Sequence, residues 1–311
     1  MCGIAGIMFK EVTGNLGDTK TAMLMALQHR GPDSTGFSLY GNRGRDSYVV
    51  WVKLREIDPV ASEFEHGSEI QKEDVFEAIT RVGGRVRETE TVTAYALRLV
   101  VDYSGDVKKL VDVVENSADA EVTSFGRCME LIKDVGLAER ITETYKLRHF
   151  EGTHGLGHVR MATESVVDVS HAHPFWAYPF SDISVVHNGQ ITNYWKYRRL
   201  LELKGNRFRS RCDSELIAVY LAVKMREGMS LEEAMRRSLT ELDGVFTYFV
   251  ATENEIGVAK DYLAAKPLVV MEDSRAVALA SEEVALRAVF PAEIDSWDPY
   301  EGEVLVWSKR S

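Results

Sequence analysis

Hydrophobic and polar positions follow two patterns along the chain, and these patterns predict strands and helices. Apolar residues three or four positions apart predict helices at residues 18–28, 193–203, 213–226 and 230–242. Short apolar runs predict buried strands, and these are CGIAGIMF at the N-terminus, LGHVRMAT and ISVVHNG in the middle, and VFTYFVAT, IGVAKD, LVVME, AVALAS and EVLVW near the C-terminus. Strands that bracket paired helices predict an α+β fold with stacked antiparallel sheets and helices against them.

The stretch between about residues 53 and 150 follows a different pattern. Its runs predict, in order, a strand at 91–103, a helix at 106–114, a strand at 122–125 and a helix at 129–135. This order predicts a small inserted α+β subdomain that divides the main domain into residues 1–52 and 151–311. Immediately before it, residues 37–40 and 48–52 predict a hairpin.

Composition narrows the classes of protein that fit this pattern. The chain has 311 residues, of which 45% are hydrophobic, enough for one large domain with a smaller one embedded. A net charge of −11 argues against a nucleic-acid partner, which would need a basic face. Cys2, Cys128 and Cys212 form no CxxC pair, which favours a reducing, cytoplasmic location. We expect neither a signal peptide nor a membrane helix, since no apolar stretch approaches ~20 residues.

Cys2 is the first candidate for chemistry. The small residue after Met1 allows removal of the initiator methionine, which would leave Cys2 with a free α-amine. The pKa of such an amine is about 7.7–8.0, so part of it is neutral at pH 7 and can act as general base for the thiol. A thiol attacks amides well and holds an acyl intermediate, although many chains begin Met-Cys by chance.

Asn188 and Gly189 follow the apolar strand at 183–186 and form the second candidate. An Asn side-chain amide and the backbone N–H of the following Gly can supply the two donors that a tetrahedral oxyanion needs. Asn-Gly is also the commonest hairpin turn, so the sequence leaves both interpretations open.

Arg160 and Asp213 are candidates for binding the two charged ends of a free α-amino acid. Arg160 ends a predicted strand and can hold a carboxylate in a bidentate pair, or lie on the surface. Asp213 can accept an ammonium group, cap the helix that follows it, or do both. His171 and His173 would share one face of a strand, but no acidic or Cys cluster lies near them, so we expect no metal.

Several short motifs occur together and carry a family resemblance. MCGIAGI, QHRGPDSTG, GHVRMAT, AHPF, VVHNGQITN and CDSE appear in this order, followed by KDYLAAKPL, ALASEEVAL and PYEGEV. Over residues 1–52 and 151–307 the chain resembles the class II glutamine amidotransferases, whose nucleophile is an N-terminal cysteine. The resemblance implies a four-layer αββα N-terminal-nucleophile hydrolase sandwich of two antiparallel sheets.

The resemblance also implies roles for individual residues. Cys2 matches the nucleophile that attacks the side-chain amide of L-glutamine to form a thioester, and Asn188 and Gly189 match the oxyanion-hole positions. The substrate-binding positions are matched by Arg160 for the carboxylate, Asp213 for the α-ammonium group and Thr163 in the pocket lining. Arg30 matches a residue that supports the nucleophile strand.

The motif GHVRMATES, together with AHPF and VVHNG, makes the chain resemble in particular the separate glutaminase subunit of archaeal-type glutamate synthase and N-methylglutamate synthase. The resemblance implies that ammonia passes to a separate synthase subunit, which would hold FMN and iron–sulfur clusters, while this chain holds no cofactor. Two alternatives remain: an N-terminal cysteine hydrolase of another amide, and a catalytically silent subunit that senses glutamine. A homo-oligomer is also left open.

Overall fold

We describe the fold from a computed structural model of the chain. The structure describes residues 2–10, 13–41, 47–54, 64–162, 167–290 and 292–309, and for residues 64–68 the backbone alone. No helix in these ranges is long and apolar enough to cross a membrane.

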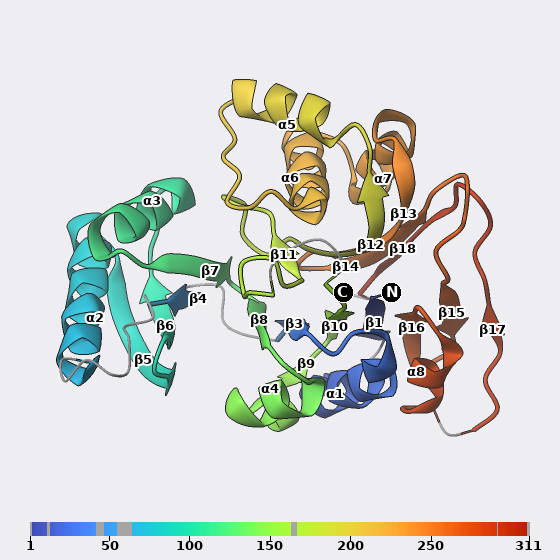
Figure 1. Cartoon of the computed structure of the whole chain (residues 1–311), viewed down its shortest axis with the longest axis horizontal. Helices are drawn as coiled ribbons and strands as arrows, with labels where there is room; N and C mark the ends of the chain where they lie inside the picture. The colour runs from blue at the N-terminus through green and yellow to red at the C-terminus, as the bar shows by residue number, and fades with distance from the viewer. Residues whose placement is uncertain are drawn as a thin grey trace.

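Two antiparallel sheets lie face to face in the centre of the molecule (Figure 1). The seven-stranded sheet has, in spatial order, β17 (Ser296–Trp297), β15 (Val269–Glu272), β16 (Ala276–Ala280), β1 (Gly3–Phe9), β10 (His154–Arg160), β3 (Ser34–Tyr40) and β8 (Met129–Val135). The five-stranded sheet has β11 (Phe175–Trp176), β12 (Ser184–Ile191), β13 (Gly244–Ala251), β14 (Glu255–Lys260) and β18 (Val304–Ser308). A two-stranded pair, β2 (Gly14–Asn15) with β9 (Glu151–Gly152), lies beside them.

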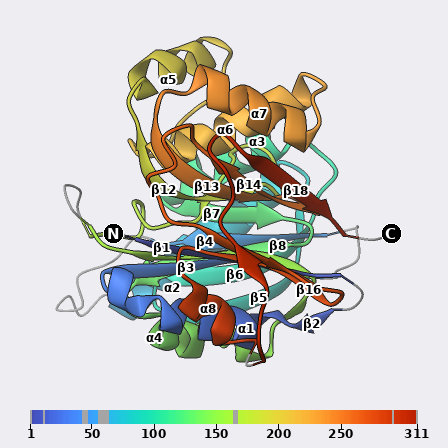
Figure 2. The ribbon, with the colours of Figure 1, turned by 90° about the vertical axis from the view of Figure 1, so that its right-hand side faces the viewer.

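Helices cover the outer face of each sheet, as Figures 1 and 2 show. The seven-stranded sheet carries α1 (Leu16–Ala26), α4 (Ala138–Thr144) and α8 (Glu283–Arg287), and the five-stranded sheet carries α5 (Tyr194–Leu203), α6 (Asp213–Arg226) and α7 (Leu231–Glu241). The order of layers is therefore helix, sheet, sheet, helix. This arrangement confirms the αββα sandwich that the sequence predicts.

The strand that begins at Cys2 is buried on both faces. Ile4 and Met8 point between the two sheets, whereas Ala5 and Ile7 point toward the helices of the outer layer. This double burial explains why the sequence here is a continuous apolar run instead of an alternating one. Beneath the strand, the fully buried Lys20 of α1 donates from Nζ to the carbonyl oxygen of Ala5 at 2.8 Å.

A second α+β unit spans residues 48–126 and projects from one side of the sandwich (Figure 1). Its elements are β4 (Tyr48–Lys53), α2 (Phe64–Arg81), β5 (Arg85–Thr93), β6 (Ala96–Asp102), α3 (Val107–Ala118) and β7 (Glu121–Gly126). The sheet order β5-β6-β4-β7 with all pairs antiparallel gives the βαββαβ arrangement of ferredoxin-like folds. Its apolar interior joins the core between the two large sheets through Phe125, which packs on Tyr48 and Trp176.

Three predicted elements differ from the structure. The single strand predicted at 91–103 is a hairpin, since β5 ends at Thr93 and β6 begins at Ala96. Residues 129–135, predicted to be helical, form β8 at the edge of the seven-stranded sheet. Leu131 and Ile132 point to opposite faces of this sheet, and both side chains are buried. The predicted hairpin of 37–40 with 48–52 is also wrong, since β3 and β4 belong to different sheets. The four-stranded unit thus includes residues 48–52 and excludes 129–150, whereas the sequence predicted an insert at about 53–150.

Candidate active site

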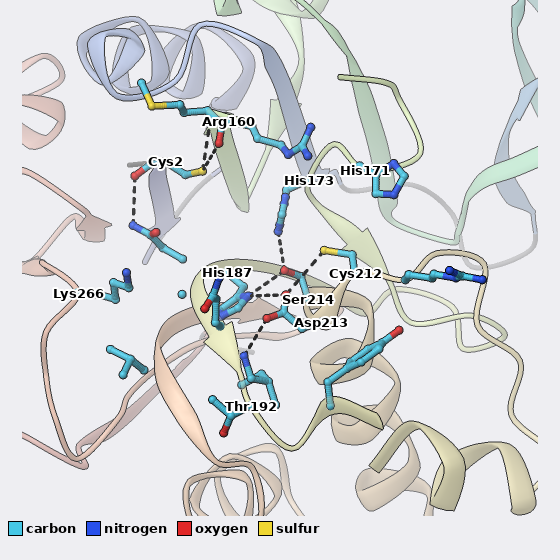
Figure 3. Close-up of a pocket in the computed structure, with 18 of the residues that line it drawn as sticks. Cys2, Arg160, His171, His173, His187, Thr192, Cys212, Asp213, Ser214 and Lys266 are labelled. Carbon is cyan, nitrogen blue, oxygen red and sulfur yellow. Dashed lines mark hydrogen bonds and ion pairs between the residues drawn. The ribbon is translucent and has the colours of Figure 1, made fainter. Parts of the chain in front are cut away.

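A pocket of about 810 Å³ opens between the two large sheets and brings together residues that lie far apart in sequence (Figure 3). Its lining includes five of the predicted site residues, namely Cys2, Arg160, Asn188, Gly189 and Asp213. Thr163, which the resemblance also predicts in the pocket lining, lies outside the described residues. The seven-stranded sheet contributes Cys2 and Arg160, and the five-stranded sheet with α6 contributes the other three.

Cys2 lies immediately before β1, and its main chain and its thiol are both held in place. Sγ lies 3.4 Å from the backbone nitrogen of Met161 and 3.6 Å from that residue's carbonyl oxygen. The Cys2 carbonyl oxygen accepts hydrogen bonds from Arg30 Nε at 2.9 Å and from Asn188 Nδ2 at 3.1 Å. Arg30 is also ion-paired with Glu282 beside α8. The side chain predicted to support the nucleophile strand therefore contacts the candidate nucleophile's own backbone.

Asn188 and Gly189 lie within β12 and not in a hairpin turn. They pair with Thr247 and Phe246 of β13, so the alternative interpretation of Asn-Gly as a turn is wrong. Gly189 has a φ of +146°, and a Cβ there would lie 2.1 Å from the carbonyl oxygen of Val245. Only glycine fits such a position. Gly189 therefore lines the pocket with its backbone, directly after Asn188, whose side chain contacts Cys2.

Asp213 is the first residue of α6, and its carboxylate lies in the wall of the pocket. Oδ2 accepts from the backbone N–H of Ile191 at 2.9 Å, and Oδ1 lies 3.5 Å from His187 Nδ1. Burial acts to raise the pKa of Asp213, but His187 and the neighbouring backbone N–H groups outweigh it, so the pKa lies below its ordinary value. A carboxylate that is charged at neutral pH both favours the helix N-terminus and suits an ammonium ligand.

Arg160 is the last residue of β10, and its relative exposure is only 6%. Figure 3 shows Arg160 and Asp213 in different walls of the same pocket, Arg160 on the side of Cys2. An ion pair with a ligand's carboxylate would be well shielded from water at such a depth. The alternative of an Arg160 on the protein surface is therefore wrong.

Three histidines and a serine form a polar chain that the sequence analysis did not anticipate, and three of its members, His173, His187 and Ser214, line the pocket. The Ser214 hydroxyl lies 2.8 Å from His187 Nδ1 and 2.6 Å from His173 Nε2, and His173 stacks on His158 with ring centres 4.0 Å apart. Burial lowers the pKa of His158 to about 3 and that of His173 well below its ordinary value, so both rings are neutral at pH 7. The signal was present, because His187 and Ser214 belong to the motifs VVHNG and CDSE.

His171 and His173 do not lie on a strand, and their rings have separate partners. His171 Nδ1 contacts Asp168 Oδ1 at 2.7 Å, whereas His173 points toward Ser214. Within the described part of the chain, no group of three or more His, Cys, Asp or Glu side chains could hold a metal ion.

Comparison with known proteins assigns the family. A family model described as "Glutamine amidotransferase domain" matches residues 158–288. The chain is 40% identical to a protein of Methanothermobacter thermautotrophicus, provisionally named a glutamine amidotransferase, and the match covers 99% of both chains. It is 34% identical to the glutamine amidotransferase-like protein GlxB of Rhizobium meliloti over 100% of this chain and 99% of that one. The chain belongs to the glutamine amidotransferase family.

Solved structures support the fold of this amidotransferase. The glutamine phosphoribosylpyrophosphate amidotransferase of B. subtilis, solved with ADP and GMP, superposes with a TM-score of 0.61. The sequence identity is 19%, and the match covers 99% of this chain and 49% of the other. This likeness supports the N-terminal-nucleophile sandwich as the scaffold. The family assignment makes the chain an enzyme of the class II glutamine amidotransferase type.

Proposed function

We propose that this amidotransferase hydrolyses the side-chain amide of L-glutamine through a thioester on Cys2. The observation that carries the proposal is the meeting of Cys2, Asn188, Gly189, Arg160 and Asp213 in one pocket, although they span residues 2 to 213. A nucleophile, an oxyanion site and two opposite charges for an amino acid are the parts that amide hydrolysis of glutamine requires.

The reaction begins with a chain that has lost Met1. The free α-amine of Cys2 takes the thiol proton, and Sγ attacks the amide carbon of glutamine. The oxyanion that forms accepts hydrogen bonds from Asn188 Nδ2 and the backbone N–H of Gly189. Asn188 Nδ2 carries two hydrogens, so it can keep its bond to the Cys2 carbonyl while it donates to the oxyanion.

The intermediate then collapses and releases ammonia. The carbon–nitrogen bond breaks as the α-ammonium of Cys2 returns its proton to the leaving nitrogen, which leaves a thioester between Sγ and the glutamyl group. Water, activated by the same amine, attacks the thioester and restores the thiol with release of glutamate. Throughout, Arg160 holds the substrate's α-carboxylate and Asp213 its α-ammonium group.

We further propose that the ammonia is used by a separate synthase subunit of the glutamate-synthase type. The motif GHVRMATES points to this type. In this proposal the partner subunit carries FMN and iron–sulfur clusters, and this chain carries no cofactor.

The test is steady-state glutamate release from glutamine, measured with and without the synthase subunit and its acceptor, alongside free ammonia in solution. We expect a low rate alone, a higher rate in the complex, and little escaping ammonia. Equal rates with all ammonia escaping would contradict the coupling and leave an independent glutaminase. Hydrolysis of other amides in preference to glutamine would favour the broader cysteine hydrolase, and glutamine binding without turnover would favour a sensor subunit.

A further inference from the structure

One face of α3 connects the inserted unit of residues 48–126 to the loop that leads into the pocket. The buried side chains of α3, Leu110, Val111, Val114 and Ala118, pack within the inserted unit. Two acidic side chains of the same helix, Asp112 and Glu115, instead form ion pairs with Arg207 and Arg209, in the loop between α5 and α6. Figure 1 shows α3 on the side of the inserted unit that faces α6.

The pair of Glu115 and Arg209 is the better shielded part of this contact. Their side chains are 14% and 16% exposed, against 42% for Arg207. The Arg209 guanidinium also donates to the Val122 carbonyl at the start of β7, and it lies 5.1 Å from the ring centre of Trp176. A pair with this much shielding and this many contacts has a fixed geometry, unlike an exposed ion pair.

Arg209 is joined in turn to the helix turn that carries Asp213. The backbone N–H of Arg209 donates to Glu215 Oε1 at 2.7 Å. The Ser210 N–H and hydroxyl donate to Glu215 Oε2 at 2.7 and 2.6 Å, and the Cys212 N–H donates to Ser210 Oγ at 3.1 Å. Glu215 is 2% exposed and lies two residues after Asp213. The loop is therefore fixed at one end to α3 and at the other to the first turn of α6.

We propose that Glu115 and Arg209 are positioning residues through which the inserted unit holds Asp213 in place to receive the substrate's α-ammonium group. This inference rests on the proposed role of Asp213. Because Asp213 would contact the ammonium group alone, a shift of the loop weakens ligands that carry an α-ammonium group and spares ligands that lack one. A merely structural role for the ion pair would affect both kinds of ligand alike.

The test is the neutral substitution Glu115→Gln, which keeps the shape of the side chain and removes its charge. We expect KM for glutamine to rise about tenfold with kcat within about twofold, because a small misplacement of a binding group acts on substrate positioning. The inhibition constant of L-glutamate should rise in parallel, whereas that of glutarate, which lacks the α-amine, should stay unchanged. Glu115→Asp keeps the carboxylate and should recover part of the affinity.

The matched control is Glu88→Gln, which removes the same charge from an exposed position on the far edge strand β5 of the same unit. It should leave both inhibition constants unchanged. If Glu115→Gln does not fold, Arg209→Lys tests the same pair, since it keeps the charge and removes the forked geometry. An unchanged KM, an equal loss of glutarate binding, or an equal effect of Glu88→Gln would overturn the inference. A wild-type chain without glutaminase activity, or an Asp213→Asn variant with normal KM, would instead overturn the proposed function.

Discussion

The sandwich and the inserted unit are built from contacts of different range. In the sandwich, β1 pairs with β10 and β16, so residues 3–9 lie beside residues 154–159 and 276–280. In the inserted unit, β5 and β6 are consecutive in sequence, and all its elements fall within residues 48–126. Among the described residues, those that line the pocket all belong to the sandwich. Glutamine hydrolysis should therefore depend on residues of the sandwich. The inserted unit should affect only the binding of the substrate.

The largest effect should come from the thiol in the sandwich. Cys2→Ala should abolish glutamine hydrolysis with an unchanged unfolding midpoint, because in the proposed mechanism the side chain is the nucleophile, and its removal costs little packing. Glutamate release and thermal unfolding provide the measurement. Cys128→Ala, which removes a thiol outside the pocket, is the control and should retain activity.

Mass spectrometry should show that the mature chain lacks Met1, and full activity with Met1 retained would contradict the α-amine as base.

The next effect concerns Asn188, the proposed oxyanion donor on the five-stranded sheet. Asn188→Ala should lower kcat by roughly 10²–10³, as expected when one donor to an oxyanion is lost. KM should change little, since the donor acts mainly in the transition state. Steady-state kinetics with glutamine separates the two constants. A loss of affinity with a normal kcat would show that Asn188 binds substrate instead.

Substrate binding should respond to the two charged residues in the pocket walls. Arg160→Ala should raise KM for glutamine by a factor on the order of 30 or more, because removal of one partner of a desolvated pair costs about 2–5 kcal/mol. Asp213→Asn should act in the same direction, through the other end of the substrate. An unchanged KM in both variants would favour hydrolysis of an amide without amino-acid ends.

A fall in pH should destabilise the sandwich more than it destabilises the inserted unit. His154, His158 and His173 all belong to the sandwich, and burial lowers the pKa of each, to about 4 for His154 and about 3 for His158. Between pH 6.5 and these values the unfolded chain binds more protons than the folded one, so stability is lost as the pH falls. For His158 alone, the loss at pH 5 is about 2 kcal/mol.

Hydrogen exchange between pH 7 and pH 5 tests this difference. Amides of β1 and β10 should lose protection more steeply than those of β4 and β6. His158→Phe should make the dependence on pH shallower, since it removes one of the groups that must take up a proton. Equal slopes in both regions would contradict the comparison.

Motif order predicted the residues of the pocket better than local patterns predicted the elements. Cys2, Asn188 and Asp213 meet in the structure because their motifs belong to a known family scaffold, although spacing alone left a hairpin turn open for Asn188. For residues 129–135, the run MELIKDV fits a helix or a buried strand, and only the neighbouring β3 decides in favour of a strand. Thr163, in the same motif as Arg160, remains a prediction.

The contacts that cross between regions could not be read from the sequence. Arg207 and Arg209 are charged residues in a polar loop, and nothing nearby in sequence identifies Asp112 and Glu115, about 90 residues earlier, as their partners. For the histidine chain around Ser214, the motifs VVHNG and CDSE contain two of its members, but the contacts among them depend on the fold, because the rings come from separate loops and strands. Side chains that pair over long distances are defined by the fold and not by local spacing.

The buried amine of Lys20 can report how often α1 and β1 separate, independently of catalysis. Burial lowers the pKa of this group well below its usual range, and its Nζ is bonded to the Ala5 carbonyl inside the layer. An acylating reagent therefore reaches this amine only when α1 and β1 separate and expose it to solvent. The labelling rate of this one lysine would count such openings in the resting enzyme. Comparing that rate with and without a bound ligand would reveal whether ligand binding in the pocket makes the separation of α1 and β1 less frequent.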